Sequence, residues 1–275
     1  MSIPLEDNFS DIIGKAQRGL GISDSQLAEK SGVSADKIRK LREGDFDDNA
    51  LDGAAPFLNL DAAALRKLAS GKWGPETIGE VEGLAQFNTT YGDMTVNAYL
   101  AWDAATREAV AFDTGADCGE MLQRIEQERL SVKLILLTHT HPDHVADLRR
   151  LRKATGAPVY VSEREAEEGA EGIKEGKRFQ VGSLEIEARL TSGHSPGGMT
   201  FVVTGLSRPL AIVGDSLFAG SMGGGNVSYE DALRNNREKI LTLPDETIVC
   251  PGHGPLTTVG KEKRDNPFFP NRLNP

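Results

Sequence analysis

The five histidines of the chain offer its clearest chemistry. Three of them, His139, His141 and His144, lie in the string Thr-His-Thr-His-Pro-Asp-His, together with Asp143. His139 and His141 are two residues apart, so their side chains point the same way if the backbone is extended. Pro142 then bends the chain and directs Asp143 and His144 toward a different point. One short loop therefore offers ligands to two neighbouring metal ions.

The other two histidines and one aspartate occupy similar positions further along the chain. His194 and His253 each follow a short apolar segment that predicts a strand, and Asp215 follows another at residues 210–213. Neighbouring glycines allow the backbone to approach a site closely. Because sites of α/β proteins cluster at the carboxyl ends of strands, we expect all three side chains to lie beside residues 139–144.

This set of side chains predicts a metal-dependent hydrolase. Imidazole and carboxylate groups suit zinc, iron or manganese. Two ions that share one carboxylate, for which Asp215 is the natural candidate, can hold a bridging hydroxide. A metal lowers the pKa of bound water to about 7, which produces a nucleophile at neutral pH. Asp143 would handle protons near the bridging position, so Asp143 and Asp215 are the predicted catalytic residues.

Strands and helices that could position these residues alternate from about residue 79 onward. The predicted strands are 94–101, 109–112, 132–138, 158–161, 184–190, 199–204, 209–213 and 247–250. The predicted helices are 117–129, 144–155, 162–168 and 229–241. This alternation is typical of layered α/β packing.

Residues 139–144 resemble the H-x-H-x-D-H motif of the metallo-β-lactamase superfamily. His194, Asp215 and His253 match the later ligand positions of that family in the expected order. The resemblance covers roughly residues 79–275 and implies an α/β fold, the αββα sandwich with its metals at one edge. It also implies two divalent metal ions, with zinc as the first expectation and iron or manganese as alternatives. By analogy His139, His141 and His194 hold one metal, Asp143, His144 and His253 hold the other, and Asp215 bridges them.

Within the superfamily the chain looks most like small bacterial glyoxalase II-like proteins, which are hydroxyacylglutathione hydrolases. The similarity lies in residues 214–221, 251–258 and 266–269. It implies a small-molecule thioester substrate such as S-lactoylglutathione. Residues 222–226, Met-Gly-Gly-Gly-Asn, depart from the Gly-Arg-x-Asp-type segment of relatives. An iron-dependent persulfide dioxygenase shares much of the ligand set and is the alternative enzyme.

A basic stretch near the C-terminus has two interpretations. Lys261, Lys263 and Arg264 either receive the carboxylates of glutathione or form a solvated charged segment.

Residues 1–76 predict a small all-α domain that precedes a catalytic domain at residues 77–275. Ser23 or Asp24 can cap one helix that Gly32 ends, and Ser34 can cap the next. Residues 48–58 and 61–69 predict two more helices.

Residues 9–70 resemble the helix-turn-helix domain of Xre/Cro-type regulators, with the match strongest over residues 22–41. The helix after Ser34 would be the reading helix. Its basic side chains, which could meet phosphates, are Lys37, Arg39, Lys40 and Arg42. Residues 1–76 nevertheless contain 10 basic and 13 acidic side chains. We therefore favour a packing, capping or dimerisation role, and keep a DNA-binding regulator with a metal-sensing domain as the alternative.

The composition limits the partners of the protein. The 275 residues carry a net charge of -10, which is a poor general match for nucleic acid or an anionic membrane. The N-terminus does not read as a secretory signal, and no apolar stretch approaches the roughly 20 residues that span a bilayer. Two cysteines, Cys118 and Cys250, suit a reducing compartment. We expect a cytoplasmic protein without a membrane partner, and leave open a homodimer.

Overall fold

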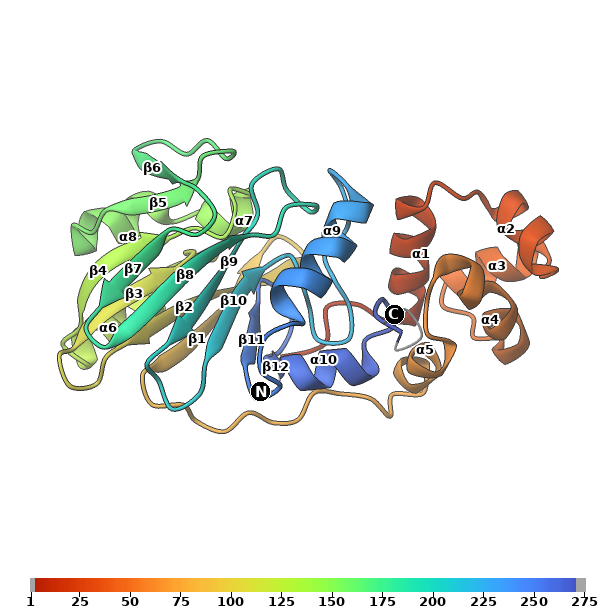
Figure 1. Ribbon diagram of the computed structural model, residues 1–275, viewed down its shortest axis with the longest axis horizontal. Coiled ribbons are helices and arrows are strands. Elements are labelled where there is room, and N and C mark those ends of the chain that lie inside the picture. The colour runs from red at the N-terminus through yellow and green to blue at the C-terminus, as the bar shows by residue number, and fades with distance from the viewer. Residues whose placement is uncertain (1–2, 271–275) are drawn as a thin grey trace.

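A computed structural model describes residues 3–270 of the chain. Two six-stranded sheets pack face to face, and helices cover their outer faces (Figure 1). The first sheet contains, in spatial order, β1 (Leu84–Tyr91), β2 (Met94–Trp102), β3 (Glu108–Phe112), β4 (Ser131–Leu136), β5 (Val159–Ser162) and β6 (Ala170–Ile173). The second contains β12 (Thr257–Thr258), β11 (Ile248–Pro251), β10 (Leu210–Gly214), β9 (Met199–Thr204), β8 (Leu184–Leu190) and β7 (Arg178–Val181).

Apolar side chains that alternate along the strands form the core between the sheets. Phe112 of the first sheet and Phe201 of the second meet there, with ring centroids 5.7 Å apart. The outer face of the first sheet packs against α6 (Gly119–Gln127) and α8 (Leu148–Thr155). The outer face of the second packs against α9 (Tyr229–Asn235), the π-helical turn η2 (Asn236–Ile240) and α10 (Val259–Asp265). These layers confirm the predicted αββα sandwich.

The sheets are mixed, and their parallel strands determine where the site lies. β3, β4, β5 and β6 are parallel neighbours in one sheet, and β10 and β11 are parallel neighbours in the other. Since parallel strands end at one edge of a sheet, the loops after β3, β4, β10 and β11 meet at a single edge of the sandwich. A short helix, α7 (Pro142–Val145), begins in the loop after β4.

The N-terminal part is helical, as predicted. Its elements are α1 (Phe9–Gly19), α2 (Asp24–Ser31), α3 (Ala35–Arg42), α4 (Asp48–Ala54), the 3-10 turn η1 (Ala55–Leu58) and α5 (Ala62–Ala69). Ser23 and Ser34 cap α2 and α3, and Gly32 ends α2 with a φ of 72°. These three local predictions are confirmed, because capping depends on residues adjacent in the chain.

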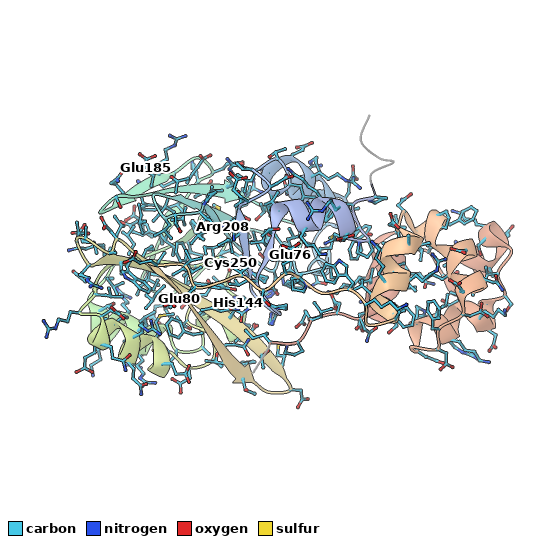
Figure 2. All side chains as sticks on the ribbon, turned by 90° about the horizontal axis from the view of Figure 1, so that it is seen from below. Glu76, Glu80, His144, Glu185, Arg208 and Cys250 are labelled. Atoms are coloured by element: carbon cyan, nitrogen blue, oxygen red, sulfur yellow. The ribbon has the colours of Figure 1, made fainter. Side chains whose placement is uncertain are left out.

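The helical part and the sandwich share one hydrophobic cluster. It joins Phe9, Ile12 and Leu65 of the helices to Tyr229 and Phe268 beyond β10. The backbone amide of Asp61 also donates to the carbonyl of Pro267 at 2.9 Å. The helices therefore pack on α9 and the chain after α10 (Figure 1). Residues 70–83, which contain the predicted domain boundary, connect the two parts and carry Glu76 and Glu80 (Figure 2).

The basic residues of α3 are engaged in ion pairs. Lys37 pairs with Asp47 at 2.7 Å, and Arg42 pairs with Asp24 at 2.6 Å. Arg39 and Lys40 both pair with Asp36. Acidic neighbours thus compensate the basic face, and DNA binding by α3 stays a prediction.

The predicted helix at residues 162–168 is wrong. β5 ends at Ser162, and turns lead from there into β6. The Glu165 carboxylate accepts hydrogen bonds from the Thr140 hydroxyl at 2.6 Å and from the Gly197 amide at 2.8 Å. The Glu163 amide donates to the Ile173 carbonyl at 2.9 Å. These tertiary contacts outweigh the helix propensity of a glutamate-rich segment.

Four strands, β1, β6, β7 and β12, were not predicted. All four lie at sheet edges, and β1 carries polar residues that weaken its apolar pattern. None of the helices within residues 3–270 has the length and apolar character required to cross a membrane.

Candidate metal centre

Four loops bring the predicted ligands to one edge of the sandwich. His139 and His141 follow β4, and α7 then positions Asp143 and His144. The remaining three come from the β8–β9 loop (His194), from the end of β10 (Asp215) and from the loop after β11 (His253). Their ligand atoms form two groups in which every atom lies within 4.8 Å of the others. One group is His139, His141, His194 and Asp215, and the other is Asp143, His144 and His253.

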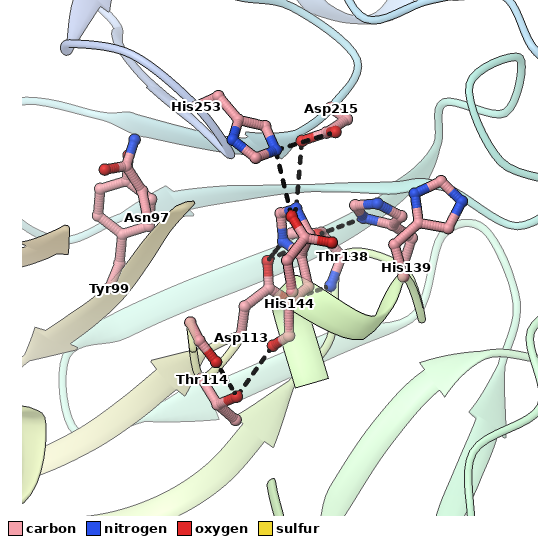
Figure 3. Close-up of polar contacts among 12 residues, drawn as sticks. Asn97, Tyr99, Asp113, Thr114, Thr138, His139, His144, Asp215 and His253 are labelled. Carbon is pink, nitrogen blue, oxygen red and sulfur yellow. Dashed lines mark hydrogen bonds and ion pairs between the residues drawn. The ribbon is translucent and has the colours of Figure 1, made fainter. Parts of the chain in front are cut away.

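Asp215 connects the two groups (Figure 3). Its Oδ2 atom lies 3.3 Å from Nε2 of His194 in the first group and 3.4 Å from Nε2 of His253 in the second. Its Oδ1 atom lies 3.3 Å from Nε2 of His144. Asp143 extends the second group, with Oδ2 3.3 Å from Nε2 of His253. One carboxylate thus faces both candidate ion positions.

Hydrogen bonds from outside the cluster orient the imidazole rings. Nδ1 of His144 lies 2.9 Å from Oδ2 of Asp113, and Nδ1 of His253 lies 2.6 Å from the Thr95 carbonyl. Nδ1 of His194 lies 3.1 Å from the Gly224 carbonyl. In each case the second nitrogen, Nε2, faces the cluster. Outer partners of this kind fix the tautomer and the orientation of a ligand.

Two buried side chains of β2, Asn97 and Tyr99 (both labelled in Figure 3), hold the His253 loop in place. The Asn97 side-chain amide donates to the carbonyls of Pro251 and Gly254, at 2.9 and 2.8 Å. The Tyr99 hydroxyl donates to the Pro251 carbonyl at 2.7 Å. The first sheet thereby positions a ligand that the second sheet carries.

The triglycine segment, residues 223–225, packs tightly against the cluster of candidate metal ligands. A side chain on Gly223 would collide with the carbonyl oxygen of Asp215 and approach Nδ1 of His194 to 3.2 Å. The following carbonyl, that of Gly224, is the partner of His194. Glycine is therefore required at residue 223 by the close approach of two backbones.

The residues present fit divalent metal ions. Three buried atoms of the ligand cluster have no hydrogen-bond partner within residues 3–270, and they are Nε2 of His139, Nε2 of His144 and Oδ1 of Asp215. An unpaired buried polar atom costs about 1–3 kcal/mol, so such atoms at one point indicate a missing partner. Imidazole nitrogen and carboxylate oxygen are donors that zinc, iron and manganese accept.

The charges of the cluster favour a cation as well. Burial lowers the pKa of His144, but Asp215 and Asp113 outweigh it and raise that pKa to about 10. Burial likewise lowers the pKa of His253, whereas Asp215 and Asp143 raise it to about 11. Burial opposes ionisation of Asp215, yet His144 and His253 hold its pKa well below the usual 3.8. The carboxylates thus attract positive charge to a buried site.

Asp113 is a site residue that the sequence analysis missed. It is 3% exposed, has a φ of 55° and accepts hydrogen bonds from the amide and hydroxyl of Thr138, both at 2.7 Å. A signal was present, because Asp113 follows the predicted strand 109–112 as Asp215 follows 210–213. No histidine accompanies it in the sequence.

The three basic residues near the C-terminus are not gathered with the histidines. Lys261 pairs with Asp265 at 3.0 Å and lies over the Trp73 ring, 5.4 Å from its centroid. Lys263 pairs with Asp245 at 2.7 Å. Both residues, and Arg264, belong to α10. Their contact with a substrate stays a prediction, and for the two lysines it would require these ion pairs to open.

The chain is similar to known metal-dependent proteins. Residues 91–253 match the family model described as the metallo-beta-lactamase superfamily. The chain is 33% identical over 204 residues to the probable metallo-hydrolase YqgX of Bacillus subtilis, which covers 65% of this chain and 94% of the relative. It is 31% identical over 198 residues to the hydroxyacylglutathione hydrolase GloC of Haemophilus influenzae, covering 63% of this chain and 92% of the relative.

A solved structure has a similar fold. The crystal structure of ETHE1 from Myxococcus xanthus superposes with a TM-score of 0.60 at 27% identity. The superposition covers 67% of this chain and 84% of that one. In all three comparisons about a third of this chain lies outside the match.

Proposed function

The chain belongs to the metallo-beta-lactamase superfamily and is a metallo-hydrolase of that superfamily, and we propose that it hydrolyses a thioester at a centre of two divalent metal ions. The observation that carries this proposal is the position of Asp215, whose two oxygens face both groups of ligand atoms. The ions of a two-metal hydrolytic centre lie about 3.5–4 Å apart, so that one carboxylate can contact both.

We assign the metal ligands according to the two groups of ligand atoms. His139, His141 and His194 would hold one ion, Asp143, His144 and His253 would hold the other, and Asp215 would contact both. Bound ions of this kind generate a nucleophile from water at neutral pH and polarise the substrate carbonyl. Zinc is the metal we expect first, with iron or manganese as alternatives.

The protein residues then contribute orientation and proton transfer. Asp113, Thr95 and Gly224 keep Nδ1 of three histidines occupied, which leaves their Nε2 atoms to the centre. The Asp143 side chain is 12% exposed and belongs to the second group, so we propose that its carboxylate accepts the proton released when water attacks the acyl carbon. A thiolate then leaves the substrate, and a carboxylate remains.

The thioester as substrate is supported by the 31% identity to the hydroxyacylglutathione hydrolase GloC. The similarity to ETHE1 is compatible with the alternative, an iron-dependent persulfide dioxygenase. The two enzymes differ in what they consume, since only the second one needs molecular oxygen.

One experiment tests both activities. The purified protein is stripped with a chelator, divided, and reloaded with zinc, manganese or iron before metal analysis. We expect the loaded protein to hydrolyse S-lactoylglutathione and the stripped protein to have lost this activity. Oxygen consumption with glutathione persulfide is measured on the same samples. If loaded protein turned over no thioester and consumed oxygen, the dioxygenase would replace the hydrolase.

A further inference from the structure

The segment that leads into α1 lies against the loop that carries His253. Gly254, which follows His253, is so close to this segment that a Cβ atom on Gly254 would be 3.2 Å from the Glu6 amide nitrogen. The same Cβ would be 3.6 Å from the Pro4 carbonyl oxygen and 3.6 Å from the Glu6 Cβ. Residues from the beginning of the chain therefore form part of the surroundings of a candidate metal ligand near its end.

Asp7 fastens this segment in place. Its side chain is 7% exposed, and Oδ2 accepts hydrogen bonds from Nζ of Lys15 and the hydroxyl of Ser221, both at 2.5 Å. Nζ of Lys15 also donates to the Met222 carbonyl at 2.9 Å. Met222 directly precedes the triglycine segment that contacts Asp215 and His194. The attachment is thus made to the same loop that borders the metal centre.

The contact with Gly254 places the Glu6 side chain beside the loop that carries His253. Burial raises the pKa of the Glu6 carboxyl group, on which the charges of His253, Asp7, Lys15 and Asp215 also act. On the same side the Phe218 ring stands edge-on to His253, with centroids 5.7 Å apart. Nζ of Lys15 lies 5.1 Å from the centroid of that ring, but Asp7 already neutralises this ammonium group. The charge of Glu6 is left without a direct ion-pair partner among residues 3–270.

This carboxylate comes from a part of the chain that lies outside the match to the family model. The match to YqgX covers 94% of that protein but only 65% of this chain, and the family model begins at residue 91. The metal ligands at residues 139–253 lie inside the family match, whereas Glu6 and Asp7 lie outside it. A selectivity that arises from Glu6 would therefore be an added property of this chain.

We propose that Glu6 is a specificity-determining residue of the metal centre, which disfavours substrates with an anionic group on the His253 side and favours neutral or cationic ones. The proposal rests on the proposed function in one respect, namely that the substrate binds at this centre. For a thioester, it predicts that the group facing Glu6 carries an ammonium or an uncharged hydrogen-bond donor rather than a carboxylate. Like charges that lie close together repel each other even when solvent screens them.

Binding of three small thiols tests the proposal without any turnover. The full chain is loaded with cobalt(II), whose absorption changes when a thiolate coordinates it. It is then titrated with 2-mercaptoethanol, 3-mercaptopropionate and cysteamine, which are neutral, anionic and cationic beyond the thiol. The same titrations are made on Glu6→Gln. Comparing variant with parent for each thiol removes the differences in thiol basicity.

We expect Glu6→Gln to lower the Kd of 3-mercaptopropionate about fivefold and to raise that of cysteamine by a similar factor. The Kd of 2-mercaptoethanol should stay within about twofold. The matched control is Glu80→Gln, an exposed glutamate of the connecting segment (Figure 2), which should change none of the three. Equal shifts for all three thiols, or no shift, would overturn the proposal.

The outcome is independent of the thioester assignment. A protein that binds the thiols with this charge dependence but hydrolyses no thioester would retain the role of Glu6 and lose the proposed substrate. A protein that hydrolyses thioesters while Glu6→Gln leaves the three affinities unchanged would retain the function and lose the role of Glu6.

Discussion

Nδ1 of His144 lies 2.9 Å from Oδ2 of Asp113, and this buried pair determines which nitrogen of His144 faces the metal centre. The same carboxylate accepts hydrogen bonds from Thr138, whose hydroxyl oxygen lies 3.1 Å from Nδ1 of His139. Asp113 therefore orients one ligand of each group, His144 directly and His139 through Thr138. A residue outside both groups thus links their geometry.

Replacing Asp113 with asparagine should weaken metal binding without breaking the backbone. Asparagine tolerates the positive φ of 55° at this residue, but its side chain cannot accept from His144 and from both groups of Thr138. Loss of an outer partner of this kind typically costs about 10- to 100-fold in metal affinity. Competition with a chromophoric chelator measures the change. The control is Asp117→Asn at an exposed carboxylate, and equal affinities in both variants would contradict the orienting role.

Asp215→Asn should reduce the metal content from two ions to at most one per chain. The substitution removes the negative charge that both ligand groups share, and metal affinity depends on anionic donors. Asp143→Asn is the matched comparison, because Asp143 belongs to the second group alone and the first group stays complete. Elemental analysis of the purified variants measures how many metal ions each of them retains. Retention of two ions by Asp215→Asn would argue against a bridging role.

Gly223→Ala should destabilise the protein by about 1–3 kcal/mol, since an added methyl group must displace the backbone of Asp215. The displacement would also move the Gly224 carbonyl away from His194, so metal content should fall with stability. Urea unfolding measures the stability change. Gly79→Ala is the control, because its Cβ would have no neighbour within 4 Å among residues 3–270. Similar losses of stability in both variants would contradict the claim that close packing against Asp215 requires glycine at residue 223.

The sequence predicted those features whose physics is local. The caps of α2 and α3 depend on Ser23 and Ser34 and on amide groups three residues away, so they could be predicted without knowledge of the fold. The side chains that the structure gathers at one edge were also readable, because each follows an apolar strand segment and five of the seven are histidines.

Features that depend on contacts between residues far apart in the chain could not be predicted from the sequence in this way. Asp113 acts through a residue 31 positions later, and Asp7 through one 214 positions later. The helix predicted at residues 162–168 failed for the same reason, since Glu165 is held by Thr140 and Gly197. Local propensity is weak beside several tertiary hydrogen bonds, and only the fold shows which of them form.

Glu262 provides a test of how pH acts on stability. It is fully buried, and its carboxylate accepts hydrogen bonds from Thr257, Asn266 and the Gly220 amide at 2.8, 2.8 and 2.9 Å. Burial raises its pKa from 4.5 to about 7, although these three hydrogen bonds act in the opposite direction. A raised pKa in the folded state means that the protonated carboxyl stabilises the fold. This contribution is complete below pH 4.5 and is lost as the pH rises through about 7.

Glu262→Gln imitates the protonated form, because its oxygen can accept from Gly220 and Asn266 while its amide donates to the Thr257 hydroxyl. We therefore expect the stability of the variant relative to the parent to improve between about pH 4.5 and 8, by on the order of 3 kcal/mol. Urea unfolding of both proteins after metal removal measures this difference at each pH, so the titration of the metal ligands cancels. A difference that stayed constant over the range would mean that Glu262 ionises in the folded protein as easily as in the unfolded chain.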